Sequence, residues 1–177
     1  MEICRRENAI EIFDLDPFLA ELLRQIPASA DPTGGDAANV DPEGVRRAQE
    51  RLFSAPAPSR EKEICQEWKV YVEPELRRLF LSATETVAED LKQLNENQKP
   101  LANYTLRIPL EHGDSWLNAL NQARLALHAR YDFTDTELCD HERSPVASRR
   151  DLSLFQVNFY GFIQEFILRG LSEEKSS

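Results

Sequence analysis

Apolar residues recur every three or four positions between about Asp114 and Arg130, and this spacing constrains the fold more than any other feature of the chain. The residues that carry it are Trp116, Leu117, Leu120, Ala123, Leu127 and Tyr131. The spacing places these side chains along one face of an α-helix, and such a face must be buried against other elements. We therefore expect a domain built around this helix.

Further segments combine an apolar stripe of helical period with a start or stop residue. Asp-Pro pairs at 16–17 and 41–42 are typical of a helix N-cap followed by a first-turn proline. Thr134 and Glu137 have the spacing of a capping box. Pro74 interrupts an apolar stripe, and we expect a new helix to start there. The predicted helices run from Pro17 to Pro27, from Pro42 to Phe53, from Ser59 through Ile64, Cys65 and Trp68 to Val72, from Pro74 to Leu94, from Asp135 onward, and from Leu152 to Gly170.

Three segments alternate with a period of two, which indicates strands. The first two, Glu2–Arg5 and Ala9–Phe13, are joined by Glu7-Asn8 and predict a hairpin. In residues 104–110, Pro109 restricts the third strand to an edge or ends it. The predicted fold class is mainly α, with a single helical domain of about five to seven helices and a small antiparallel sheet made of the N-terminal hairpin plus the 104–110 strand.

The length of 177 residues fits one domain over residues 1–177. Residues 28–40 are small, polar, Pro and Gly, so we expect a mobile loop there. Beyond the glycine C-cap at Gly170, residues 171–177 are expected to form a disordered tail.

Composition narrows the class of protein. With 41% hydrophobic and 29% charged residues, the chain resembles an ordinary globular protein. Its formal net charge of −10 argues against nucleic acid as a partner, because nucleic acid binding depends on Lys and Arg. No apolar run approaches the roughly 20 residues of a membrane span, so we expect no membrane partner. Three widely spaced cysteines predict a reduced, cytoplasmic setting.

No strong catalytic motif occurs in the sequence, so the chain reads more readily as a non-enzyme, and we expect no cofactor. A weak metal-type cluster combines His128 with Cys139, Asp140 and His141. His112 and Asp114 could supply an acid and a base, but a helix N-cap is the simpler interpretation. The carboxylates of Glu85, Glu89 and Asp90 are expected to be solvated.

Asn121 and Arg124 border the apolar face of the central helix, each four residues after a leucine. A guanidinium at such a border is partly desolvated and needs an acidic or carbonyl partner. The sequence leaves two roles open for Arg124, a structural clasp between helices or an anchor in a protein interface.

The segment Trp116-Leu117-Asn118-Ala119-Leu120-Asn121, followed by Arg124-Leu125, resembles the Trp-Leu-x-Ala-Leu-Asn-x-x-Arg-Leu pattern of an uncharacterised bacterial domain family. Leu15 to Leu23 and Phe162 to Glu165 support the resemblance. The chain departs from the family at His128, where glycine is usual, and residues 28–59 show no resemblance. Members in actinobacteria are often encoded near the ClpS protease adaptor, which implies a bacterial cytosolic setting and a link to proteolysis. The family supplies no catalytic residue.

Three hypotheses follow. The first is a non-enzymatic regulatory or adaptor-type protein-interaction module, with candidate contacts at Trp116, Asn121, Arg124, Gln164 and Glu165. The second is an enzyme with an atypical site that uses His112, Asp114, His128 or His141. The third is a homodimer in which the face from Phe159 to Ile167 packs on itself.

Overall fold

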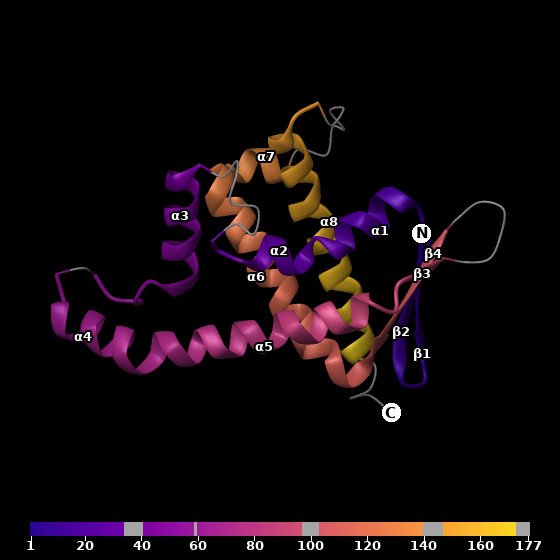
Figure 1. Cartoon of the computed structure of the whole chain (residues 1–177), viewed down its shortest axis with the longest axis horizontal. Helices are drawn as coiled ribbons and strands as arrows, with labels where there is room; N and C mark the ends of the chain where they lie inside the picture. Colours follow the sequence, from indigo (N-terminus) through magenta and orange to yellow (C-terminus); the bar gives the residue numbers. More distant parts are fainter. Residues whose placement is uncertain (34–40, 59, 97–102, 140–146, 173–177) are drawn as a thin grey trace.

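The computed structural model describes residues 1–33, 41–58, 60–96, 103–139 and 147–172. It confirms the predicted fold class, a mainly helical single domain with a small antiparallel sheet (Figure 1). Seven helices lie within the described residues when the two α-helices joined by a π-helical turn are counted as one. The elements are β1 (Glu2–Arg6), β2 (Ala9–Leu15), α1 (Pro17–Arg24), α2 (Ile26–Ala30), α3 (Pro42–Phe53), α4 (Lys62–Glu67), the π-helical turn (Trp68–Val72), α5 (Glu73–Leu91), β3 (Asn95–Glu96), β4 (Tyr104–Pro109), a 3-10 turn (Leu110–His112), α6 (Gly113–Tyr131), α7 (Asp135–Cys139) and α8 (Arg149–Ser172).

The sheet has the order β1-β2-β4-β3, so the three predicted strands are present and β3 adds to them at one edge. In β2, Ile10 and Ile12 are buried, as the alternation of side chains along a strand requires. Leu15 lies three residues after Ile12 and would point to the opposite face of a regular strand, yet it is buried as well. The register shifts between Ile12 and Leu15, and Asp14 has a positive φ of 51° there. This irregularity turns Leu15 back to the core face.

Helix α6 lies at the centre of the domain and packs against α2, α3, α5 and α8. Its buried residues include Trp116, Leu120 and Leu127, together with alanines at 119, 123 and 126. Small side chains between large ones let neighbouring helices approach closely. The apolar stripe that singles out this segment in the sequence therefore forms part of the main core.

The predicted helix starts are confirmed by hydrogen bonds. Asp16 Oδ1 accepts from the backbone N–H of Leu19 at 2.8 Å. Asp41 caps α3 in the same way. At α7 the capping box is reciprocal, because Glu137 accepts from the backbone N–H of Thr134 and donates its own N–H to the Thr134 hydroxyl. These bonds join residues at most three positions apart, which is why sequence alone predicts them.

Several predicted boundaries need correction. Pro27 does not end a helical region but lies in the first turn of α2, so residues 28–30 are helical instead of belonging to the predicted loop. Residues 34–40 of that loop lie outside the described residues, as does the predicted cap Ser59. Residues 171 and 172 complete α8 instead of starting the predicted tail, and residues 173–177 are not described.

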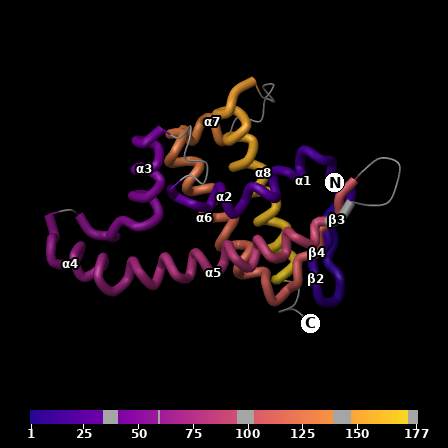
Figure 2. Tube along the Cα trace, viewed as in Figure 1, coloured from indigo at the N-terminus to yellow at the C-terminus, as the bar shows by residue number. Residues whose placement is uncertain are grey.

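The region from α4 to α5 differs most from expectation. The predicted helix start at Pro74 is confirmed, because α5 begins at Glu73 with Pro74 in its first turn, but a π-helical turn joins α5 to α4 without a break in the helical path (Figure 2). The extra residue of a π turn rotates all later side chains relative to earlier ones. No residue from 62 to 82 is buried, so the predicted apolar face of this segment is not part of the core. Only the second half of α5 packs inside, through Ala83, Val87 and Leu91.

We name residues 62–81 the arm. In Figure 1 it extends from the domain on the side opposite the sheet, and α3 stands above it and runs across its direction. The arm contacts the domain body near Phe53, where Trp68 Nε1 donates a hydrogen bond to the Phe53 carbonyl at 2.9 Å.

Replacement of Gly44 tests how α3 packs on α6. A Cβ at Gly44 would lie 2.7 Å from the backbone oxygen of Arg130. We expect Gly44→Val to lower the free energy of unfolding by about 1–3 kcal/mol, because overpacking displaces backbone. Urea unfolding measures this, with the exposed Arg51→Val on the same helix as control. Equal stability of the two variants would contradict the close packing.

Candidate functional site

The residue pair Arg124 and Gln164 ties α6 to α8. Arg124 Nη1 donates to Gln164 Oε1 at 2.6 Å, and Gln164 Nε2 donates to the Leu117 carbonyl at 3.1 Å. The guanidinium lies beside Gly161, where a Cβ would be 3.2 Å from its central carbon. Burial lowers the pKa of Arg124. Of the two roles that the sequence left open, this geometry is that of a clasp.

The five predicted interaction residues do not share one surface. Trp116 is fully buried, and Arg124 and Gln164 contact each other. Asn121 and Glu165 are exposed, and Glu165 forms an ion pair with Arg169 on its own helix. Of the five residues, Asn121 and Glu165 are exposed, whereas Arg124 and Gln164 are partly buried.

A double-mutant cycle tests the clasp. We expect Arg124→Met and Gln164→Leu each to destabilise the domain and to show a coupling energy of about 1 kcal/mol, because either change alone removes the same hydrogen bond. Urea unfolding of the wild type, both single variants and the double variant gives the coupling. Additivity within about 0.3 kcal/mol would argue against the clasp.

Asp90 is buried, contrary to the expectation of a solvated carboxylate, with an exposed fraction of 2%. Its carboxylate accepts a hydrogen bond from Trp116 Nε1 at 2.8 Å and lies 3.0 Å from His112 Nδ1. The spacing of apolar residues around Asp90 does not indicate this burial, because both partners of its carboxylate lie more than twenty residues further along the chain. Asp114, predicted with His112 as a possible acid–base pair, is exposed in the first turn of α6.

An Asp–His contact of this kind orients an imidazole, as in many general-base sites. Here the carboxylate also binds Trp116, and among the described residues no serine, threonine or cysteine forms a hydrogen bond with His112. The arrangement therefore performs a structural role directly: it satisfies a buried indole N–H at the junction of α5 and α6.

Loss of Asp90 leaves the Trp116 N–H buried without an acceptor. We expect Asp90→Ala to lower the free energy of unfolding by about 3 kcal/mol, and Trp116→Phe to strand the carboxylate at a similar cost. The neighbouring exposed Glu89→Ala is the control and should change stability by less than about 0.5 kcal/mol. Chemical denaturation of the three variants checks the ranking.

The predicted metal residues are only partly described. Among the described residues, no group of three or more His, Cys, Asp or Glu side chains could hold a metal ion. His128 lies against the Phe133 ring, with centroids 6.4 Å apart. The side chain of Cys139 and all of residues 140–146 lie outside the described part, so this candidate cluster remains a prediction.

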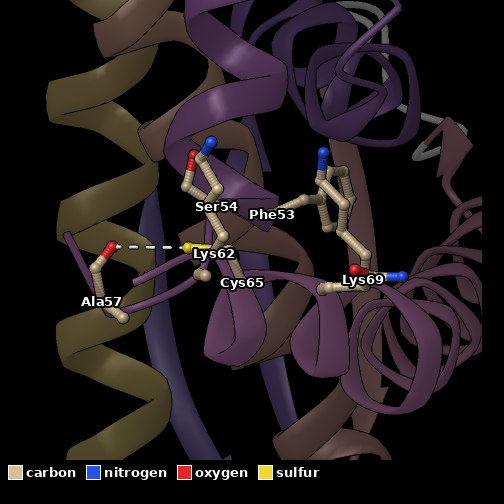
Figure 3. A pocket seen from close by; sticks show the side chains of 8 residues that line it. Phe53, Ser54, Ala57, Lys62, Cys65 and Lys69 are labelled. Atoms are coloured by element: carbon tan, nitrogen blue, oxygen red, sulfur yellow. Dashed lines mark hydrogen bonds between the residues drawn. The ribbon is translucent and has the colours of Figure 1, made fainter. Parts of the chain in front are cut away.

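Two hollows are lined by Phe53 together with residues of the arm. The first has a volume of about 630 Å³ (Figure 3). The sulfur of Cys65 lies 3.7 Å from the Pro58 carbonyl oxygen, and Lys62 and Lys69 bring positive charge to the wall. The lining residues are Phe53, Ser54, Ala55, Ala57, Lys62, Cys65, Gln66 and Lys69.

The second hollow, which we name the Gln122 hollow, has a volume of about 340 Å³ and lies between α2, α5 and α6. The guanidinium of Arg77 stacks 3.7 Å from the Phe53 ring centroid, and Glu73 holds it at 2.7 Å. The wall is formed by Pro27, Ala30, Asp31, Pro32, Thr33, Phe53, Arg77, Phe80, Leu81, Thr84 and Gln122. No motif or spacing in the sequence indicates a functional role for Arg77 or Gln122.

These elements define a mainly helical domain with a small antiparallel sheet. The chain belongs to the family described as a domain of unknown function (DUF2017), whose model matches residues 11–171. The expected membership of an uncharacterised domain family is thus confirmed, and the match includes residues 28–59, which showed no resemblance by inspection. No curated protein and no solved structure matches the chain. Within the described residues, no helix is long and apolar enough to cross a membrane.

Proposed function

We propose that this protein is a non-enzymatic regulatory or adaptor-type module that binds another protein through the arm. One observation carries the proposal: large apolar side chains are exposed along the arm, which contributes no fully buried residue to its own domain, although Leu76 and Phe80 pack partly against the apolar cluster around Phe53. Tyr71 at the π-helical turn is 75% exposed. The other exposed apolar residues of the arm are Ile64, Val70, Val72, Leu79 and Leu81.

Physical chemistry favours a covered arm. Helices in proteins owe most of their stability to the packing of one face, and local ion pairs add only about 0.2–0.5 kcal/mol each. The arm has such pairs at Glu73–Arg77 and Glu75–Arg78, but most of its large apolar side chains are exposed to water. Contiguous apolar surface on a soluble protein is typical of interaction sites. The matching partner surface is an apolar groove wide enough for a helix.

The setting of this partner rests on the sequence resemblance alone. A bacterial cytosolic location and a genomic association with the ClpS adaptor make components of a proteolytic system the first partners to test. Gene neighbourhood is an association and not a mechanism, so the structure of the arm, and not its family, motivates the experiment.

Site-specific photo-crosslinking in native cells tests the proposal. We expect a photoreactive phenylalanine at Tyr71 to give one reproducible adduct with a second protein, and the same group at the exposed Lys92 to give none. Identified by mass spectrometry, the partner is then purified. Its affinity for the arm variants Val72→Glu and Leu79→Glu should fall at least tenfold while their melting temperatures stay within about 2 °C of wild type, because these residues are exposed.

The outcomes separate the hypotheses. Unchanged affinity in the arm variants, or no adduct at Tyr71, contradicts the proposal. An adduct of the chain with itself supports a homodimer through the arm. Of the Phe159 to Ile167 face predicted to form a homodimer, Phe159, Ile163 and Ile167 are buried inside the domain and Phe162 is exposed, so this homodimer stays a prediction that an adduct at Phe162 would support.

An enzyme with His112 as base is the second candidate function, favoured by the contact between His112 and Asp90. It predicts that a change of His112 to Gln abolishes a turnover that the arm variants retain. The adaptor proposal predicts the reverse, with partner binding lost in the arm variants and kept in His112→Gln.

A further inference from the structure

The amide of Gln122 is buried without a hydrogen-bond partner for its Nε2 atom. Only 2% of this residue is exposed, and it lines the Gln122 hollow. A polar group removed from water without a partner destabilises the folded state, so such a group calls for an explanation.

A second buried glutamine in the same domain shows the normal arrangement. Gln156 on α8 is 4% exposed, and its Nε2 donates to Gln25 Oε1 at 2.8 Å and lies 3.4 Å from the Tyr160 hydroxyl. The fold therefore satisfies one interior amide fully and leaves the other with an unused donor beside a hollow. This contrast points to a ligand that supplies the missing acceptor.

The remaining walls define the rest of that ligand. Phe53, Phe80 and Leu81 make the lining largely apolar. Its volume lies at the lower end of the roughly 300–1,000 Å³ of ligand sites, which suits one small molecule or one inserted residue.

The polar groups of the wall favour an acceptor over a donor. One oxygen of the Asp31 carboxylate, Oδ1, is already occupied, because it accepts from the backbone N–H and the hydroxyl of Thr33 at 2.8 and 2.7 Å. The guanidinium of Arg77 adds positive charge and further N–H donors, although Glu73 holds one edge of it.

We propose that the Gln122 hollow binds a small apolar group that carries a carbonyl or carboxylate oxygen, with Gln122 Nε2 donating to that oxygen. The apolar group, about the size of a leucine side chain, occupies the space between Phe53, Phe80 and Leu81. The same chemistry occurs in a free acyl compound and in an apolar residue of a polypeptide. The site shares Arg77, Phe80 and Leu81 with the arm, but its test uses free probes and needs no protein partner.

Nuclear magnetic resonance of the full chain tests the site with matched probes. We expect N-acetyl-leucine and N-acetyl-leucinamide to shift the side-chain NH₂ resonances of Gln122 saturably and to raise the melting temperature. Isopentylamine has the apolar group without an acceptor, and N-acetyl-glycine has the acceptor without the apolar group; both should bind at least tenfold more weakly. A longer peptide that ends in leucine, compared with N-acetyl-leucine, separates a polypeptide source from a free one.

Substitution of the two buried glutamines should change the melting temperature in opposite directions. Gln122→Leu, or the unbranched Gln122→Met, should raise the melting temperature without ligand, because it removes an unsatisfied amide, and should weaken both acyl probes at least tenfold. The control Gln156→Leu should lower the melting temperature, because its amide is satisfied. Arg77→Met should weaken N-acetyl-leucine more than N-acetyl-leucinamide if the carboxylate meets the guanidinium.

Three results would overturn the proposal: no saturable shift with either acyl probe at millimolar concentration, full retention of probe binding in the Gln122 variants, or a melting temperature of Gln122→Met that falls as far as that of Gln156→Leu. Because the probes act on the wild-type protein, the test stands even if a variant fails to fold. Loss of arm binding in the earlier experiment leaves these results unaffected.

Discussion

Burial of helix α6 against four other helices is the constraint on which the rest of this structure depends. Trp116 and Leu120 have no exposed surface, and the alanines around them let α2, α3, α5 and α8 come close. Buried apolar area is worth roughly 25 cal/mol per Å², so this helix carries a large share of the stabilisation of the core. The small sheet then closes the core on one side, through Ile12 and Leu106.

Polar side chains on such an enclosed helix are also removed from water, and each then needs a hydrogen-bond partner. The Trp116 indole meets Asp90, and Arg124 meets Gln164. Four side-chain atoms nonetheless stay buried without a partner among the described residues: Thr105 Oγ1, Gln122 Nε2, Arg124 Nε and Arg130 Nε. Of these, Gln122 Nε2 belongs to a residue that lines a hollow, whose other walls come from three further parts of the chain.

The arm contrasts with this enclosed centre. The π-helical turn at Trp68–Val72 rotates the apolar residues of α4 and α5 out of line. Several of them therefore face water, while Leu76 and Phe80 pack partly against the apolar cluster around Phe53. Phe53 and residues of the arm line both hollows, so the proposed ligand site lies next to the proposed interaction surface. A ligand in the Gln122 hollow would touch Arg77 and Leu81 of the arm itself.

The sequence by itself determined the mainly helical class, the hairpin, the central helix and the caps at Asp16, Asp41 and Thr134, because these depend on side chains within a few positions of each other. Only the tertiary structure decided that Asp90 is buried, that Arg124 is a clasp and that Gln122 lacks a partner. It also decided that the stripe beginning at Ile64 remains in water. Burial depends on which distant segments meet, and residues such as Asp90 and Trp116 meet across 26 positions. Local periodicity shows which face is apolar, but only the packing of the whole chain determines whether that face is covered.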